Sequence, residues 1–366
     1  MISDARTVPF VTYHSSLITC YISLRDTMHT SGFTAAIVDP KVSARRIFNL
    51  IASELLLVEA EFERQARSNI QVIAYIGDYL RESGGKRVRP ALHILSNYAV
   101  GGDGGRTNSI RMAAVMEFLH TATLVHDDII DNAETRRNRP SINSRFGNQA
   151  AVLMGDWLYM SAFETSLTER SLPILDILTS VTRQMTEGEL LQLTTIGRTD
   201  ISEEQYFDIL KRKTAYLFSA CCEIGAIMGA AAPDIQSALR NFGLSLGMAF
   251  QLIDDLLDFT AAEDVLGKAA GADLLEGKMT LPLILLLQSD PSMRERVQTV
   301  MRDGHYQNVT RDFLIRAVED SGALAKTREC AFEYADSARS SLFPLPNSVY
   351  CDALHSIPTF IVERDS

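Results

Sequence analysis

The chain has 366 residues, of which 46% are hydrophobic and 22% charged, so it can bury one large core or two smaller ones. Its net charge of −11 excludes general binding of nucleic acid through a basic surface. No run of about eighteen apolar residues is present, so we predict no transmembrane segment.

Residues 1–40 differ from the rest of the chain. They lack regular apolar spacing and match neither a signal peptide nor a transit peptide well. We therefore expect a poorly ordered N-terminal extension over 1–40 and a single domain over 41–366.

From residue 41 onward, apolar residues recur at spacings of three and four, which predicts helices almost throughout. This rhythm runs through 51–79 and 110–130. Later helical segments lie near 149–169, 173–196, 203–230, 234–259, 280–288, 292–302, 310–319 and 322–341. Asp234 is predicted to cap one of these helices, and Ser202 leads into another. Strand-type alternation is scarce, so the predicted fold is an all-α bundle with a central cavity.

The five cysteines favour neither a disulfide framework nor a zinc site. Their number is odd, two are adjacent, and no C-x-x-C motif occurs. This usage predicts a reducing compartment, and we expect the protein to be cytoplasmic.

Two acidic clusters of the form D-D-x-x-D lie inside predicted helices. They comprise Asp127, Asp128 and Asp131 in the first copy, and Asp254, Asp255 and Asp258 in the second. The first and last aspartates of each copy are four residues apart, so they share a helix face on which like charges repel. A divalent cation would offset that repulsion, and oxygen-only ligands suit Mg²⁺ or Mn²⁺. Because Mg²⁺ often shares its shell with phosphates, two such faces across a cavity would hold a diphosphate.

Four basic groups supply candidate phosphate ligands. The first is the loop GGKRVRP (84–90), in which two glycines precede Lys86, Arg87 and Arg89 near a predicted helix start. The other three are Arg136-Arg137, Lys213-Thr214, and Lys268 with Lys278 in the glycine-rich stretch 267–282. Arginine suits bidentate contacts to phosphate, and a glycine-rich stretch could close over a site as a lid.

Each motif also has a purely structural interpretation. An acidic cluster on a helix is commonly a solvated outer face, and a basic run is commonly a surface turn. The duplicated acidic pattern together with the basic groups favours a phosphate site instead. The adjacent His126 and Asp127 would also suit a metal-dependent phosphohydrolase, but His93 and His120 do not complete a clear His-His-Asp arrangement.

Five ordered motifs give the chain a family resemblance. They are GGKRVRP (84–90), HTATLVHDDIID (120–131), KRKTA (211–215), FQLIDDLLDF (250–259) and GKAAGADLLEGKMTLP (267–282). Over roughly residues 45–366, the chain resembles the trans-isoprenyl diphosphate synthases, and among them the bacterial long-chain (octaprenyl-type) polyprenyl diphosphate synthases. The resemblance implies an isoprenoid-synthase helical bundle and a homodimer. It also implies a reaction that joins an allylic diphosphate to isopentenyl diphosphate and releases pyrophosphate.

The resemblance also implies residue roles. Asp127, Asp131 and Asp254 would hold Mg²⁺ on the allylic diphosphate, and Asp128, Asp255 and Asp258 would support that arrangement or complete it. The implied catalytic residues are Asp127, Asp128, Asp131, Lys213, Asp254, Asp255 and Lys268. Isopentenyl diphosphate would be bound by Lys86, Arg89, His120 and Arg137. The allylic substrate would be contacted by Arg136, Lys213, Thr214, Gln251 and Lys268. No general base is expected, because released pyrophosphate can accept the final proton.

Ala122 and Thr123 bear on product length. They precede Asp127 by five and four positions, where the resemblance implies that short-chain members carry bulky aromatics. Both are small here, so we expect the cavity to continue past them and to admit a product of about eight to ten isoprene units, used for quinone side chains. The alternatives are small residues at an ordinary helix contact, a short-chain (geranylgeranyl-type) synthase, a terpene cyclase, and a non-catalytic subunit of a hetero-oligomer.

Overall fold

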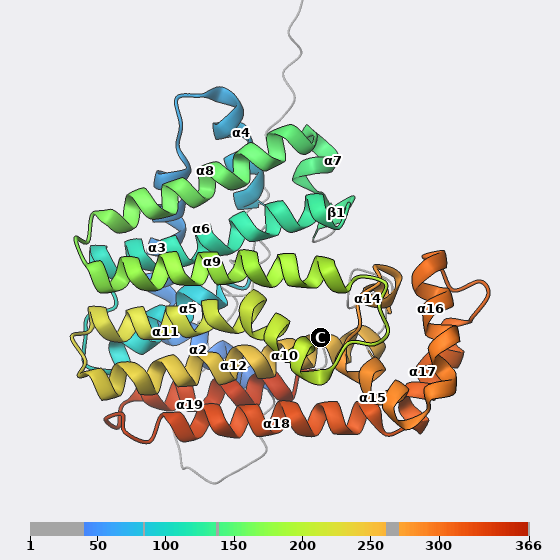
Figure 1. Cartoon of the computed structure of the whole chain (residues 1–366). Helices are drawn as coiled ribbons and strands as arrows, with labels where there is room; N and C mark the ends of the chain where they lie inside the picture. The colour runs from blue at the N-terminus through green and yellow to red at the C-terminus, as the bar shows by residue number, and fades with distance from the viewer. Residues whose placement is uncertain (1–39, 83–84, 137–138, 261–270, 365–366) are drawn as a thin grey trace, which may run out of the picture. The chain divides into compact units, whose positions relative to one another are not determined.

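The computed structural model describes residues 40–82, 85–136, 139–260 and 271–364 (Figure 1). These residues all belong to one compact unit of the chain. The predicted extension, apart from Pro40, lies outside the described residues. Within the described residues, no helix combines the length and the apolarity needed to cross a membrane.

The first half of the described chain is helical apart from one very short hairpin. In order it contains α2 (Pro40–Leu50), α3 (Ala52–Ala66), α4 (Gln71–Glu82), α5 (Val88–Ala99), α6 (Thr107–Ile130), β1 (Thr135–Arg136), β2 (Arg139–Pro140), α7 (Ile142–Phe146), α8 (Asn148–Leu167) and α9 (Leu172–Thr195). The two strands are antiparallel, with Thr135 opposite Pro140. This hairpin follows directly on the first acidic cluster.

The second half contains helices of three kinds. In order they are α10 (Glu203–Leu210), the π-helical turn η1 (Lys211–Ala215), α11 (Tyr216–Met228), α12 (Pro233–Thr260), α14 (Ala272–Leu275), α15 (Leu281–Ser289), the 3₁₀ turn η2 (Pro291–Met293), α16 (Arg294–Asp303), α17 (Arg311–Asp320), α18 (Ala323–Ser341) and α19 (Val349–Val362). The all-α prediction is confirmed.

Long helices form the bundle. Helix α6 packs against α3, α5 and α8, while α12 packs against α11 and α18, and α5 joins α11 to α6. Side chains such as Phe118, Phe218 and Phe242 are fully buried between them. Figure 1 shows α6, α9 and α12 ending on the same side of the bundle, near β1 and α14. The two acidic clusters, which lie at the ends of α6 and α12, are therefore at one end of the fold.

Two glycines bring α12 close to the segment that carries the KRKT run. A Cβ atom on Gly243 would lie 2.5 Å from the carbonyl oxygen of Phe218, and one on Gly247 would lie 2.6 Å from the Cα atom of Ala215. No larger residue leaves room for this approach. The helix spacing places η1 directly beside the helix of the second acidic cluster.

Several helix boundaries differ from the predictions. The segment 203–230 is not one helix, because a π-helical turn interrupts it at η1. The rhythm over 51–79 is broken after α3, where Arg67 is extended. The helix start predicted after Ser202 is confirmed at Glu203, and Ser202 caps α10 in a capping box with Gln205. The predicted cap Asp234 was wrong, because α12 already begins at Pro233 and Asp234 lies in its first turn.

Candidate active site

The first acidic cluster closes the C-terminal end of α6. The amide of Asp131 donates to the carbonyl of Asp127 at 2.8 Å, so one helical turn joins the two carboxylates. Burial raises the pKa of Asp127 to about 6; Lys213 opposes this shift, while Glu189 and Asp131 add to it. Asp127 therefore lies in a region with few charge-stabilising contacts, where a cation would be favourable.

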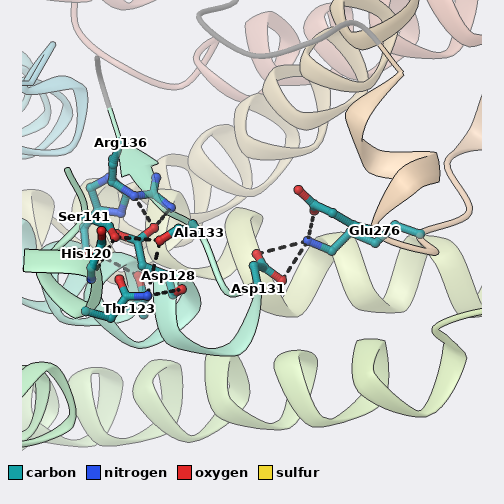
Figure 2. Close-up of polar contacts among 11 residues, drawn as sticks. His120, Thr123, Asp128, Asp131, Ala133, Arg136, Ser141 and Glu276 are labelled. Carbon is teal, nitrogen blue, oxygen red and sulfur yellow. Dashed lines mark hydrogen bonds and ion pairs between the residues drawn. The ribbon is translucent and has the colours of Figure 1, made fainter. Parts of the chain in front are cut away.

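Asp128 has a different environment from its neighbours. Its side chain is buried, and both the Nε and Nη2 atoms of Arg136 contact its Oδ1 atom, at 2.6 and 2.5 Å (Figure 2). The amide of Asn143 donates to the backbone carbonyl of Asp128 at 3.1 Å. These contacts tie the hairpin to the end of α6. The structure therefore places Arg136, a predicted substrate ligand, on a carboxylate of the first cluster.

Asp131 contacts a lysine from a distant part of the chain. The Nζ atom of Lys278 donates to both carboxylate oxygens of Asp131 at 3.1 Å and to Glu276 at 2.7 Å (Figure 2). Burial disfavours the Lys278 ammonium, but Asp131 and Glu276 outweigh burial and raise its pKa. The glycine-rich stretch after α12 thus reaches the first cluster through Lys278.

The second cluster lies near the end of α12. Asp254 forms an ion pair with Arg364, whose guanidinium also donates to the carbonyl of Phe250 at 3.1 Å and lies 4.3 Å from its ring. Burial raises the pKa of Asp254, which Arg364 opposes. Asp258 is buried, and its Oδ2 atom accepts from the amide of Asp273 at 3.4 Å.

Asp255 is held by neutral donors. The hydroxyl of Tyr206 donates to its Oδ2 atom at 2.6 Å, and the amide of Gln251 donates to its Oδ1 atom at 3.0 Å. Burial raises the pKa of Asp255 to about 8, and the charge of Asp273 adds to the shift. Tyr206, from α10, thus contacts a carboxylate of the second cluster.

The π-helical turn η1 contacts α9 on one side and the second cluster on the other. The hydroxyl of Thr214 donates to Gln251 at 3.0 Å, and Gln251 in turn contacts Asp255. Its neighbour Lys213 forms an ion pair with Glu189 at 2.5 Å and donates to Gln192 at 2.9 Å. Single π-turns inserted in α-helices occur frequently at functional sites, because the extra residue redirects side chains. Here the turn directs Lys213 toward α9 and Thr214 toward α12.

The basic residues in the loop before α5 have different surroundings. Arg87 has a positive φ of 49° and is held by Glu59 and by the buried Glu117, at 2.6 Å from the latter. Lys86 is exposed, and its charge lowers the pKa of Asp254, although burial of Asp254 dominates in the opposite direction. Arg87 is therefore a structural residue, and Lys86 faces the second cluster.

The remaining predicted residues have the following positions. The Arg89 guanidinium lies 5.0 Å from the centroid of the Phe218 ring. His120 and Thr123 are half-buried on α6, where the Thr123 hydroxyl donates to the His120 carbonyl at 2.7 Å, and Ala122 is fully buried. Arg137 and Lys268 lie outside the described residues.

Several site residues were missed by the sequence interpretation. They are Glu189, Gln192, Tyr206 and Arg364, and for Lys278 the contact with Asp131. Glu189, Gln192, Tyr206 and Arg364 lie in helical runs or near the end of the described chain, outside the quoted motifs. Only the tertiary contacts with known motifs reveal them.

The residues present suit a divalent metal that is shared with a substrate. In the part of the chain that the structure describes, no three His, Cys, Asp or Glu side chains converge into a ready-made metal cage. Mg²⁺ does not require one, because it commonly binds one or two carboxylates and completes its shell with water and phosphate oxygens. Asp127 and Asp131, one turn apart, and Asp254 on α12 offer such an oxygen-only set.

The sequence profile of the polyprenyl synthetase family matches residues 70–315, which is more than half of the chain. The chain belongs to the polyprenyl synthetase family. It is thus a member of a trans-prenyltransferase family, whose enzymes use a divalent metal.

Three relatives illustrate the range of the family. The octaprenyl diphosphate synthase of Escherichia coli (strain K12) is 37% identical over 325 residues, covering 88% of this chain and all of the relative. A short chain isoprenyl diphosphate synthase of Methanothermobacter thermautotrophicus is 35% identical over 309 residues, covering 82% of this chain and 94% of the relative. A third comparison is with the crystal structure of a polyprenyl synthase from Caulobacter crescentus CB15 complexed with calcium and isoprenyl diphosphate. It has a TM-score of 0.83 at 34% identity, and the match covers 88% of this chain and 98% of that chain.

Proposed function

We propose that this protein is a Mg²⁺-dependent long-chain polyprenyl diphosphate synthase. It condenses an allylic diphosphate with successive molecules of isopentenyl diphosphate, to about eight to ten isoprene units, and releases pyrophosphate at each step. The observation that carries the proposal is the network between the two acidic clusters. Thr214 and Gln251 lead to Asp255, the adjacent Lys213 acts on Asp127, and Lys278 reaches Asp131.

The acidic residues divide into two groups in this proposal. Asp127, Asp131 and Asp254 would hold Mg²⁺, which when bound supplies positive charge to the diphosphate that leaves. Asp128 and Asp255 hold surrounding elements through Arg136, Tyr206 and Gln251, as their contacts support. Asp258 organises the end of α12.

The residues proposed to bind the two substrates lie at different places. Lys213, Thr214, Gln251 and Lys268 contact the allylic diphosphate and stabilise the negative charge that develops as it leaves. Lys86, Arg89, His120 and Arg137 bind isopentenyl diphosphate. That separate site brings the double bond close to the allylic carbon and spares the entropy cost of an encounter in solution. The released pyrophosphate accepts the proton that completes each cycle.

Incubation of the purified protein with farnesyl diphosphate, isopentenyl diphosphate and Mg²⁺ tests this function. We expect successive elongation, with a long-chain product identified by mass spectrometry. Failure of the protein to elongate by itself would contradict the proposal and favour a non-catalytic subunit of a hetero-oligomer. EDTA should abolish elongation, and added Mg²⁺ should restore it.

The product length depends on α6. Ala122→Phe should shorten the main product, because a buried phenyl ring would obstruct the cavity beside the metal ligands. Ala122→Ser is the matched control and should keep the wild-type length. A wild-type main product of four isoprene units would instead favour the short-chain alternative. The 35% identity with a short chain isoprenyl diphosphate synthase is the reason to test it.

We propose in addition that the enzyme is a homodimer. On α8, Leu153 and Met160 are 68% and 62% exposed, and on the neighbouring α9 Leu190 is 58% exposed. Residues 153 and 160 are two helical turns apart and share a face, so the exposed apolar groups form a surface that a second copy would cover. Light scattering should report a dimer, and replacement of Leu153 and Met160 by Glu should give a monomer.

A further inference from the structure

A tyrosine outside all the recognised motifs contacts the segment that follows the second acidic cluster. Tyr306 lies between α16 and α17, and Figure 1 shows α16 beside α14. Its hydroxyl donates to the carbonyl of Gly271 at 2.7 Å, just before α14. Tyr306 is half-buried against the core, whereas its neighbours His305 and Gln307 are exposed. The side chain therefore points inward from a surface turn.

Gly271 suits this contact for two reasons. Its φ is +77°, a conformation that side chains with a Cβ atom rarely adopt. A Cβ atom on Gly271 would also lie 2.3 Å from the hydroxyl oxygen of Tyr306. The hydroxyl thus occupies the space that any larger residue at position 271 would need.

The same glycine is bonded to the second acidic cluster. The amide of Gly271 donates to the backbone carbonyl of Asp258 at 2.7 Å, and the amide of Asp273 donates to the carboxylate of Asp258 at 3.4 Å. A continuous chain of hydrogen bonds therefore runs from Tyr306 through Gly271 to the last aspartate of the cluster. The start of α14 is thus hydrogen-bonded to both the backbone carbonyl and the side chain of Asp258.

We propose that Tyr306 is a positioning residue for the second acidic cluster, holding Gly271 and the start of α14 against Asp258. Burial, together with the charges of Asp258 and Asp273, raises the pKa of Tyr306, so its hydroxyl stays protonated and able to donate. The consequence for metal binding rests on the proposed function. The consequence for the backbone does not, because the hydrogen bonds belong to the protein alone.

Tyr306→Phe removes the donor and keeps the ring. Tyr98→Phe is a matched control, because Tyr98 is also half-buried and its hydroxyl donates a hydrogen bond to Glu54 at 2.8 Å. That hydrogen bond does not involve either acidic cluster. In the metal-free protein, amide hydrogen exchange over residues 271–275 should become about two- to tenfold faster in Tyr306→Phe and stay unchanged in Tyr98→Phe.

The second measurement is the Mg²⁺ dependence of the thermal shift that pyrophosphate produces. In Tyr306→Phe the half-saturating Mg²⁺ concentration should rise about two- to tenfold, with kcat near wild type at saturating Mg²⁺. Gly271→Ala should change both readouts in the same direction.

Unchanged exchange over residues 271–275 in Tyr306→Phe would overturn the proposal. An equal change in Tyr98→Phe would do so as well, because it would show only a general loss of stability. Since exchange is measured without substrate or metal, a protein that proves unable to elongate prenyl chains would still give a clear answer. Failure of the proposed function and failure of this inference are thereby separated.

Discussion

At the end of α6, Asp128 is held by the guanidinium of Arg136, whereas at the end of α12 the corresponding Asp255 is held by a phenol and an amide. A cationic partner compensates a buried carboxylate, but neutral donors do so incompletely, so the pKa of Asp255 rises to about 8. One sequence pattern thus occurs in two electrostatic environments. The second aspartate of each copy therefore contacts neighbouring protein groups, and those groups differ between the two clusters.

The two clusters share one feature: in each, an aspartate forms an ion pair with a basic residue from a distant part of the chain. Asp131 contacts Lys278, and Asp254 contacts Arg364, so each cluster offers one carboxylate to a cation from a remote segment. These lysine and arginine contacts indicate that both sites favour positive charge. Substitutions in the two clusters should show whether they are equivalent in function.

The largest effect is expected from the proposed metal ligands. Asp127→Asn and Asp254→Asn should each lower kcat by about a thousandfold, because each removes a charged oxygen ligand where negative charge develops. Steady-state assays over a range of Mg²⁺ concentrations measure this. Asp234→Asn, at the exposed opposite end of α12, is the control and should stay near wild type. A large loss for only one of the two variants would show that the clusters are not equivalent.

The next effect concerns the lysine on the first cluster. Lys278→Gln should lower kcat/KM by about ten- to a hundredfold, because a half-buried cation beside Asp131 is lost where the diphosphate is expected to bind. Lys278→Arg keeps the charge and should recover part of the activity. If Lys278→Gln behaved like the wild type, Lys278 would serve only to balance Asp131 in the protein without ligands.

Stability should separate the two buried aspartates. Asp128→Asn leaves the Arg136 guanidinium without its charged partner and should cost about 2 kcal/mol of unfolding free energy, a value that allows for the partial exposure of Arg136. Near pH 5, where the Asp255 carboxyl is protonated in the folded protein, Asp255→Asn keeps a neutral group of the same shape and should cost about 1 kcal/mol or less. Urea unfolding in EDTA measures both. Equal losses would contradict the electrostatic difference described above.

A further prediction is a pH dependence of stability carried by Asp255. The pKa of this carboxyl is about 8 in the folded protein and about 4 in an unfolded chain, so the folded state binds the extra proton between these values. Its contribution to stability is present at low pH and is lost as the pH rises through 8. Relative to Asp255→Asn, the metal-free wild type should lose stability between pH 5 and pH 9. Parallel curves for the two proteins would contradict this assignment.

Local patterns in the sequence predicted much of the fold and of the site. Apolar spacing depends only on the 3.6-residue helical repeat, so most of the helices and the shared face of Asp127 and Asp131 were predictable. The helix start after Ser202 was predicted from the polar residues there. The π-helical turn at η1 was not, because its single extra residue leaves the apolar rhythm of 203–230 almost unchanged. Its position beside α12 depends on the close approach allowed by Gly243 and Gly247.

The amino-acid sequence by itself determined the helical class, the family and the carboxylates that suit a divalent metal, because these follow from residue type and short spacing. Only the tertiary structure decided which group faces each carboxylate. Lys278 is 147 residues from Asp131, and Arg364 is 110 residues from Asp254. Contacts over such separations depend on how the helices pack, and no local periodicity encodes them. The same packing gave two identical motifs different charge partners.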